Sequence, residues 1–297
     1  MTNENTVSVM APMQLHGRRA IYTNEPVITQ GNVIRVLNQA LTVHNVNRSE
    51  ETYLQRFDRG VQPILDRVKV YNNYVCNRVV VNVANQITTF KAAEFAGEPI
   101  QYVSRSSKKS VPKKIEKLNS LMISEGKRSK DYELAYKMFC NGVSYRLILN
   151  DPKRNPANAE LLDEAPFEIY IPDPKNTFIV RLNDVTRRVV MGVTYVFLDE
   201  LENRVRYTVY TDDVTYTIEG TTLAGDKITD VVRHNFGMVT LVEYPCNSIY
   251  MAPVEVVHDL LNAYNLTMSD RLDGIEQFIQ ALMVFDGIDI SREEFLE

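Results

Sequence analysis

The feature that most constrains this sequence is the stretch from Pro253 to Gly287, near the C-terminal end. Its apolar residues recur at steps of three and four, which keeps one face of an α-helix apolar. Pro253 suits the first turn of a helix, where its missing N–H costs nothing, and Gly287 suits the position just past the end. Roughly 30 residues at about 1.5 Å each would make a rod on the order of 45 Å. We therefore predict one long helix; Gly274 weakens it by roughly 1 kcal/mol relative to Ala but leaves the periodicity intact.

The other face of this predicted helix is acidic. Its carboxylates are Glu255, Asp259, Asp270, Asp273, Glu276 and Asp286, and Arg271 is its one basic residue. Such a face is either the solvated side of a helix that covers a core, or the lining of a passage through which a polyanion must move without binding. The sequence leaves both interpretations open.

The composition is that of a globular protein. The 297 residues are 44% hydrophobic and 9% aromatic, which is enough to bury a core in one or two domains. No apolar run is long enough to cross a bilayer, and the N-terminus lacks the regions of a secretory signal, so we expect a cytosolic product. Cys76, Cys140 and Cys246 are widely spaced and form no CxxC motif, so we expect free, buried thiols.

The net charge of −5 conceals a basic segment between Arg105 and Lys130. This segment holds nine Lys or Arg residues and only two Glu residues. It is either a solvated surface or a patch that contacts nucleic acid or an acidic neighbour. A nucleic-acid-binding module that uses residues 105–130 is therefore the alternative functional hypothesis. The candidate patch residues are Lys108, Lys109, Lys113 and Lys114.

The N-terminal half of the chain is predicted to be mostly helical. Residues 1–29 lack sustained periodicity and are expected to form an arm without a core of its own. Asn47 or Ser49 can cap a second helix, so two short helices are expected before Gly60. The expected helices cover residues 30–46, 50–59 and 77–95 and two further segments after Pro112 and Ser129, and the expected strands cover residues 100–103 and 143–149.

From Phe167 the period of the pattern changes to two. Short segments rich in Val, Ile, Thr and Tyr alternate with turn signals up to Tyr244. They predict an antiparallel β-meander with one face packed on the preceding helices. The fold class is therefore α+β: helices plus a meander, followed by one long helix.

The sequence contains none of the catalytic motifs HExxH, GxSxG and GxGxxG. The segment from Gly220 to Lys227 imitates a phosphate loop, but its lysine does not directly follow the second glycine, so it reads as a turn between strands. The histidines are far apart, and a nuclease would need a carboxylate cluster that the sequence does not show. We therefore predict no enzyme activity, cofactor or metal. The four histidines, each expected to be on the surface or hydrogen-bonded, are His16, His44, His234 and His258.

Residue patterns say more than periodicity in two blocks of the chain. The first contains Tyr53, Phe57, Gly60, Gln62-Pro-Ile-Leu-Asp-Arg67, Asn77-Arg-Val-Val-Val-Asn-Val-Ala84 and Ala96-Gly-Glu-Pro-Ile-Gln-Tyr102. The second contains Gly237-Met-Val-Thr-Leu-Val-Glu-Tyr-Pro-Cys-Asn247, Glu255-Val-Val-His-Asp-Leu-Leu-Asn-Ala-Tyr-Asn265, Ser269-Asp270, Ile275-Glu-Gln-Phe278 and Phe285-Asp-Gly287. In this order and spacing they resemble the portal proteins of long-tailed bacteriophages. The resemblance spans most of the chain.

The resemblance implies a dodecameric ring in the virion, at one vertex of the capsid, assembled in the host cytoplasm and not in a membrane. Double-stranded DNA would pass through the ring during packaging and ejection, and terminase, a head–tail adaptor and the major capsid protein would bind it. Residues 1–29 would be an arm, 30–250 a wing domain, 251–286 the first stem helix and 287–297 the start of a clip. Family members usually continue with a clip, a second stem helix, a tunnel loop and a crown; only Ile288–Glu297 follow Gly287 here, so either the chain is a truncated product or the sequence stops before these parts.

A DNA channel gives the acidic face of the long helix a role. Each Lys or Arg that contacts a phosphate adds affinity through counterion release, so a lining of carboxylates favours sliding over binding. Under this hypothesis, the apolar face packs on neighbouring subunits. The channel-lining candidates are Glu255, Asp259, Asp270, Asp273 and Glu276, and the subunit-interface candidates are Leu261, Tyr264, Phe278 and Leu282.

Overall fold

The computed structural model describes residues 17–70, 74–105, 110–150, 165–199 and 201–279. The chain divides into two compact units. The first unit comprises Met1–Gly60 and Asn82–His258, and the second comprises Val61–Val81 and Asp259–Glu297. The fold is α+β, as the sequence predicts.

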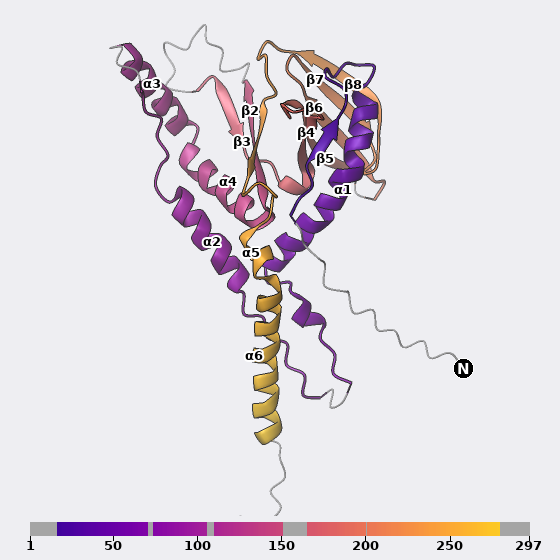
Figure 1. Cartoon of the computed structure of the whole chain (residues 1–297), viewed down its shortest axis with the longest axis vertical. Coiled ribbons are helices and arrows are strands. Elements are labelled where there is room, and N and C mark those ends of the chain that lie inside the picture. Colours follow the sequence, from indigo (N-terminus) through magenta and orange to yellow (C-terminus); the bar gives the residue numbers. More distant parts are fainter. Residues whose placement is uncertain (1–16, 71–73, 106–109, 151–164, 200, 280–297) are drawn as a thin grey trace, which may run out of the picture. The chain divides into compact units, whose positions relative to one another are not determined.

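A six-stranded sheet dominates the first unit (Figure 1). Five of its strands follow one another as an antiparallel meander, which confirms the prediction for this part of the chain. The sixth strand, β1, pairs in parallel with β4 at the edge. In sheet order the strands are β1 (Ile21–Thr23), β4 (Thr177–Leu182), β5 (Val189–Asp199), β6 (Arg204–Tyr210), β7 (Val214–Gly220) and β8 (Gly225–Arg233).

Helix α1 (Val33–Asp58) covers one face of this sheet (Figure 1). Its buried apolar residues fall at helical steps of three and four, so they form a single stripe. The stripe packs on inward side chains of the strands, among them Phe178, Met191 and Tyr207. These contacts form the main core. The residues of the stripe are Val33, Val36, Leu37, Ala40 and Leu41.

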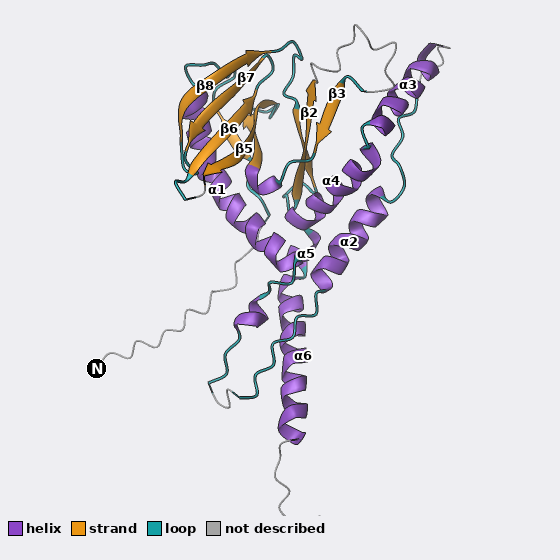
Figure 2. Cartoon of the chain, turned by 180° about the vertical axis from the view of Figure 1, so that it is seen from behind, coloured by secondary structure: helices purple, strands orange, loops and turns teal. Residues whose placement is uncertain are grey.

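A second, three-stranded sheet has the order β3 (Phe167–Tyr170), β2 (Val143–Asn150) and β9 (Leu241–Pro245), all antiparallel. The prediction that all the strands after Phe167 form one meander is therefore wrong for the first and the last of them. These two strands, β3 and β9, pair with the two edges of β2 instead, because β2 is not part of the meander and both its edges need hydrogen-bond partners. Figure 2 shows α2 (Val83–Ala96) and α4 (Lys127–Asn141) side by side next to this sheet, with α3 (Ser110–Ser124) preceding α4.

The described part of the predicted arm, residues 17–29, belongs to the core. Ile21 and Ile28 are buried in it, and the N–H of Arg18 donates to the carbonyl of Tyr250 at 3.1 Å. The prediction of a coreless arm is wrong for this segment, because the pairing of β1 with β4 orders a stretch that has too few apolar residues to order itself. Residues 1–16 lie outside the described ranges.

Two of the shorter predictions also fail for identifiable reasons. Helix α1 does not break into two, because the expected caps are occupied: Asn47 exchanges hydrogen bonds with the backbone of Arg19 at 2.9 and 2.8 Å, and the Ser49 hydroxyl donates to the Asn45 carbonyl at 3.0 Å. The expected strand at residues 100–103 is a loop. The backbone N–H and carbonyl of Tyr102 both bond to the side chain of Asn119, at 3.0 Å each.

The second unit consists of helix α6 and the segment Val61–Val81, which we call the strap. Helix α6 covers His258–Ile279, 22 residues, or about 33 Å. The strap begins with a short 3-10 helix, Pro63–Asp66, and runs in extended conformation from Asn77 to Val81. Within the described residues, no helix is both long and apolar enough to cross a membrane.

Candidate functional site

The long helix predicted from Pro253 is divided in two. Helix α5 (Pro253–Val256) begins at the proline, as predicted, and the N–H of Ala252 donates to the Glu255 carboxylate at 2.5 Å. The backbone leaves helical geometry at Val257 (φ −113°, ψ 11°), and α6 starts at His258. The prediction of an unbroken helix is therefore wrong at this point. Residues 280–287 lie outside the described ranges.

One face of α6 holds the strap through a row of polar side chains. Asn265, Ser269 and Asp273 accept hydrogen bonds from the backbone N–H groups of Val81, Val79 and Asn77, at 2.9, 3.0 and 2.6 Å. Four residues of helix rise about 6 Å, and two residues of extended chain span about 6.6 Å, so the two spacings nearly match. We call Asn265, Ser269 and Asp273 the polar ladder.

All three members of the polar ladder are buried. Asn265 and Ser269 are 0% exposed and Asp273 is 2% exposed. Buried polar groups cost free energy unless they are hydrogen-bonded, and the strap supplies the donors. The polar face that the sequence suggests to be solvated is therefore in large part covered by the chain itself. The helical period predicts that these residues lie on the polar face of the helix. It does not predict that an extended segment some 190 residues away supplies their hydrogen-bond donors.

Asp273 is the most strongly paired of the predicted channel residues. Its carboxylate forms ion pairs with Lys69 at 2.5 Å and Arg67 at 3.1 Å. Burial raises the pKa of Asp273, but Lys69 and the Asn77 donors outweigh it and lower the pKa to about 2. The side chain of Asp273 is therefore an ionised carboxylate when it binds the strap.

Glu255 is also buried, at 7% exposure, and forms an ion pair with Arg18. Arg18 lies within 3.2 Å of Glu50 on α1 as well, and Arg19 pairs with Glu50 at 2.8 Å. Burial raises the pKa of Glu255, and Arg18 partly offsets that shift. The prediction that Glu255 and Asp273 belong to a solvent-facing acidic surface is wrong, because each is buried against basic groups of its own subunit.

The other three acidic candidates remain at the surface. Asp259 and Asp270 are exposed, and Glu276 is half-buried. Asp270 is ion-paired with Arg67, and Glu276 accepts a hydrogen bond from the Asn77 amide at 2.9 Å. Asp259 and Asp270 are eleven residues apart, about three helical turns, so they point to the same side of α6.

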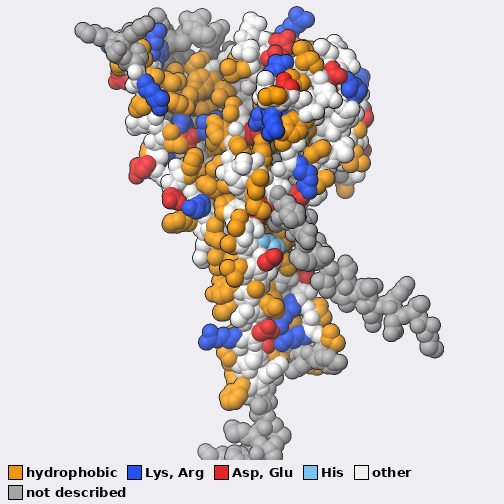
Figure 3. Space-filling model, in the orientation of Figure 1, with side chains coloured by type: hydrophobic (Ala, Val, Ile, Leu, Met, Phe, Trp, Pro, Cys, Tyr) orange, Lys and Arg blue, Asp and Glu red, His pale blue; other side chains and the backbone are white. Residues whose placement is uncertain are grey.

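The subunit-interface candidates likewise divide into a buried residue and exposed ones. Leu261 is buried, at 7% exposure, whereas Tyr264 is 43% and Phe278 is 83% exposed. Leu261 is therefore not available to a neighbouring subunit, which corrects its place among the candidates. Leu282 lies outside the described residues. Around α6, hydrophobic side chains reach the surface (Figure 3).

The basic-patch candidates are half described. Lys113 and Lys114 lie exposed on α3, as does Lys117. Lys108 and Lys109 are outside the described residues. The described part of the patch thus presents its charges to solvent.

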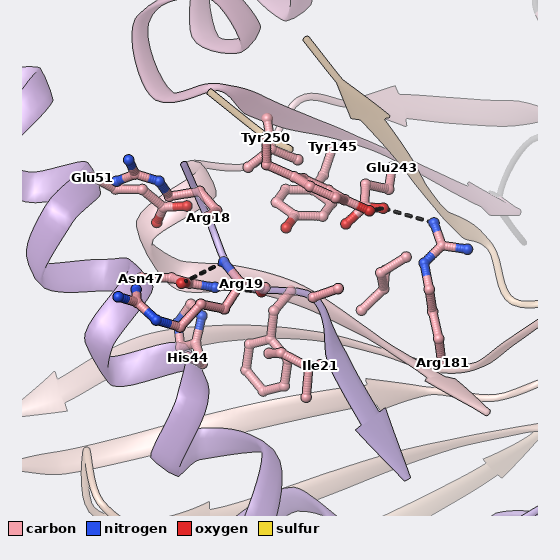
Figure 4. Close-up of a pocket in the computed structure, with 14 residues that line it drawn as sticks. Arg18, Arg19, Ile21, His44, Asn47, Glu51, Tyr145, Arg181, Glu243 and Tyr250 are labelled. Atoms are coloured by element: carbon pink, nitrogen blue, oxygen red, sulfur yellow. Dashed lines mark hydrogen bonds and ion pairs between the residues drawn. The ribbon is translucent and has the colours of Figure 1, made fainter. Parts of the chain in front are cut away.

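The ion pairs of Arg18 and Arg19 with Glu50 and Glu255 form a group that we call the Arg18 cluster. It lies beside a small buried cavity (Figure 4). The cavity has a volume of about 10 Å³, and Glu51, His44, Tyr145 and Tyr250 are among its lining residues. Burial raises the pKa of Glu51 well above its ordinary value and lowers the pKa of His44 to about 3. This cluster fixes residues 18 and 19 to α1 and α5, which the sequence gives no means of foreseeing.

The histidine prediction holds for the two that are bonded to tyrosines. His44 Nε2 lies 3.1 Å from the Tyr195 hydroxyl, and His258 Nε2 lies 2.7 Å from that of Tyr53. Among the described residues, no group of His, Cys, Asp and Glu side chains could hold a metal ion. The three cysteines are free, but the prediction that they are buried is right only for Cys140, since Cys76 and Cys246 are half-buried.

Comparison with known proteins connects this architecture to a family. Residues 38–297 match the sequence profile of the family described as phage portal protein, SPP1 Gp6-like. No curated protein matches the chain. The match covers most of both units described above, from within α1 to the end of the chain. The chain therefore belongs to the phage portal proteins, a structural family of the virus capsid.

Proposed function

We propose that copies of this chain form a closed ring, a dodecamer, at one vertex of the phage capsid, and that double-stranded DNA passes through it during packaging and ejection. The family match carries this proposal, because it covers residues 38–297 and the family is one of capsid-associated oligomers. The first structural unit corresponds to the wing. The second unit, α6 with the strap, corresponds to the stem.

The channel lining in this proposal is narrower than the sequence suggests. Glu255 and Asp273 are buried, and Glu276 is hydrogen-bonded to the strap. The side of α6 that carries Asp259 and Asp270 remains exposed, and we call it the line. Ala263, one turn after Asp259, and Gly274, one turn after Asp270, are small residues on or close to the same side. We propose that this line faces the DNA.

Electrostatic repulsion between the channel and DNA would therefore come from the few exposed carboxylates of the line and not from the net charge of the stem unit. In Val61–Val81 and Asp259–Ile279, five acidic residues stand against four basic ones, so the described stem unit carries almost no net charge. A phosphate near the line would meet the exposed carboxylate of Asp259 and that of Asp270, whose charge Arg67 partly offsets. DNA that touches no unpaired cation gains little counterion-release affinity and can slide.

The wing offers surfaces for the other proteins. We propose that terminase, the head–tail adaptor and the major capsid protein bind the ring outside the channel. The exposed lysines of α3, Lys113 and Lys114, lie on the exterior or between subunits in this proposal. There they would attract an acidic neighbour without holding DNA in the bore.

The mass of the native particle tests the proposal. Light scattering and electron microscopy of the purified protein are expected to give rings of many subunits with a central opening. DNA binding is expected to be weak, with a shallow dependence on salt. A monomer or dimer that binds DNA with a steep salt dependence would contradict the ring and support a nucleic-acid-binding module that uses residues 105–130.

A further inference from the structure

Helix α6 has an exposed apolar face on the side away from the strap. At 100° per residue, Ser269 of the polar ladder and Phe278 are half a turn apart, so they point in opposite directions. The exposure of the apolar residues on this side ranges from 43% to 83%, and a contiguous exposed apolar patch of this kind marks an interaction surface. We call this surface the free face. Its residues are Leu260, Tyr264, Ile275, Phe278 and Ile279.

The strap has an exposed apolar surface of its own. Val68 is 59%, Val70 is 88% and Tyr74 is 97% exposed, and Val61 and Leu65 are partly exposed. We call this set of five side chains the strap surface. The polar ladder uses the backbone N–H groups at Asn77, Val79 and Val81, so the bonds that hold the strap on α6 do not use these side chains.

One charged residue lies on each of the two surfaces. Arg271 is exposed on the free face, between the rows that contain Phe278 and Tyr264. Asp66 is exposed beside Leu65 and is the only acidic residue of the strap. Within the ranges that the structure describes, neither residue forms an ion pair with another side chain. Of the other basic residues near the ladder, Arg67 and Lys69 are paired with carboxylates of α6, and exposed Arg78 donates through Nε to the Arg67 carbonyl at 3.0 Å.

These surfaces suit a head-to-tail contact between identical chains. A ring requires two different patches on each subunit, one that binds the next copy and one that is bound by the previous copy. The second unit presents two apolar patches, and the exposed charges of Arg271 and Asp66, neither of which is ion-paired within the described residues, are opposite. If an apolar contact buries Arg271, it needs an anion in the partner surface, because a buried charge without a partner is strongly destabilising.

We propose that the free face of α6 in one copy packs on the strap surface of the next copy, with Arg271 of the one paired with Asp66 of the other. This inference rests on the proposed ring and names the residues that close it. In this arrangement the strap of each subunit is the surface to which α6 of the neighbouring subunit binds. The strap thus has two sides: α6 of its own chain binds its backbone and its polar side chains, and α6 of another chain binds the strap surface.

Charge reversal tests the pairing directly. Asp66→Arg and Arg271→Asp are each expected to raise the subunit concentration needed for ring formation roughly tenfold or more, because like charges then meet in every contact. The double variant Asp66→Arg/Arg271→Asp is expected to assemble again. An equimolar mixture of the two single variants is also expected to form rings, since alternating subunits place opposite charges at every contact.

The mixture separates a contact between chains from one within a chain, because an intrachain pair would not be restored by mixing. Lys227→Asp, at an exposed position on β8, is the control for a charge reversal elsewhere. Tyr74→Ser, at a fully exposed side chain, should weaken assembly while leaving the unfolding midpoint unchanged. Circular dichroism of every variant checks that the fold is kept.

Several results would overturn the inference. Normal rings from either single charge variant or from Tyr74→Ser would show that the strap surface is not in the contact. A double variant or a mixture that stays unassembled would show that Asp66 and Arg271 are not partners. In both cases the wild-type ring, and hence the proposed function, would stand. Absence of rings in the wild-type protein would instead remove the proposed function and this inference together.

Discussion

Asp273 accepts hydrogen bonds from both the backbone N–H and the side-chain amide of Asn77, at 2.6 and 2.9 Å. Both bonds end on Oδ1 of Asp273; they join residues 196 positions apart in the chain and set which residue of the strap faces which turn of α6. Ser269 and Asn265 continue the same register toward the N-terminal end of the helix. The second unit is thus held together by polar contacts more than by an apolar core.

Removal of one member of the polar ladder is expected to loosen the strap. Asn265→Ala deletes the acceptor for the Val81 N–H and also the donor to Gln62, and leaves buried polar groups unpaired. We expect a cost of about 1–3 kcal/mol, with faster hydrogen exchange at Val79 and Val81. Thr267→Ala is the matched control, since the Thr267 hydroxyl donates to the Ala263 carbonyl of its own helix and not to the strap. Equal exchange in both variants would refute the ladder.

Acid is expected to weaken the same contact through Asp273. Its folded-state pKa of about 2 lies below the usual value, so the ionised carboxylate stabilises the folded state above about pH 4 and this contribution is lost as the pH falls toward 2. Urea unfolding should show Asp273→Asn less stable than the wild type at pH 6, on the order of 2 kcal/mol. The difference should shrink at pH 2.5. A difference that does not change with pH would show that the carboxylate is not ionised in the fold.

Two glycines should respond oppositely to replacement by alanine. Gly142 has φ +84°, and a Cβ there would lie 2.1 Å from the Tyr250 carbonyl oxygen, so Gly142→Ala should destabilise the first unit by about 3 kcal/mol or more. Gly274 lies in α6, and a Cβ there would meet no atom within 4 Å, so Gly274→Ala should stabilise by up to about 1 kcal/mol. Thermal unfolding of both variants measures the contrast. A stabilised Gly142→Ala would mean that the 250 turn moves away easily.

Leu261 and Phe278 separate folding from assembly. Leu261→Asp places a charge at a position that is 7% exposed and should lower the free energy of unfolding by several kcal/mol. Phe278→Asp changes a side chain that is 83% exposed, so folding should be nearly unaffected while ring formation is lost. Unfolding curves and particle mass distinguish the two effects. If Phe278→Asp assembles as well as the wild type, this part of α6 faces no neighbour.

The channel hypothesis is tested by reversing the line of exposed carboxylates. In the double variant Asp259→Lys/Asp270→Lys, folding should change little, because both side chains are at the surface and an exposed ion pair such as Asp270 with Arg67 contributes little. DNA affinity should rise and become strongly dependent on salt, and packaging should slow or stall. Asp226→Lys, at an exposed position on β8, is the matched control. Packaging at the normal rate with unchanged DNA affinity would show that the line does not face DNA.

The sequence predicts the elements whose partners are close in the chain. The meander from β4 to β8 and the stripe of α1 from Val33 to Leu41 are visible as periods of two and of three to four residues. The pairing of β3 and β9 with β2 is not, because an alternating pattern marks a strand without naming its neighbour. Asn47 shows the same limit, since a residue that can cap a helix can also bond the backbone of Arg19 inside one.

The candidate site was harder to predict than the fold for a related reason. Periodicity sorts α6 into an apolar and an acidic side, but it cannot tell a solvated carboxylate from one that another segment covers. Asp273 and Asp270 differ by three residues in sequence, yet one is 2% exposed and the other is at the surface. The deciding partners, Asn77 and Lys69, lie in a stretch of mixed valines and polar residues that has no regular period. The exposed Arg271 and Asp66 likewise become informative only once their surroundings are known.

Recognition of the strap through its backbone has a consequence for how this protein can vary between phages. Because Asn265 and Ser269 bond the strap at Val81 and Val79 through backbone N–H groups, nearly any residue except proline can occupy those two positions without loss of the register. Side chains on the outer surface are then free to change in step with whatever surface they meet. Related proteins should therefore keep the acceptors on the helix while the strap residues diverge, with proline excluded from positions 79 and 81.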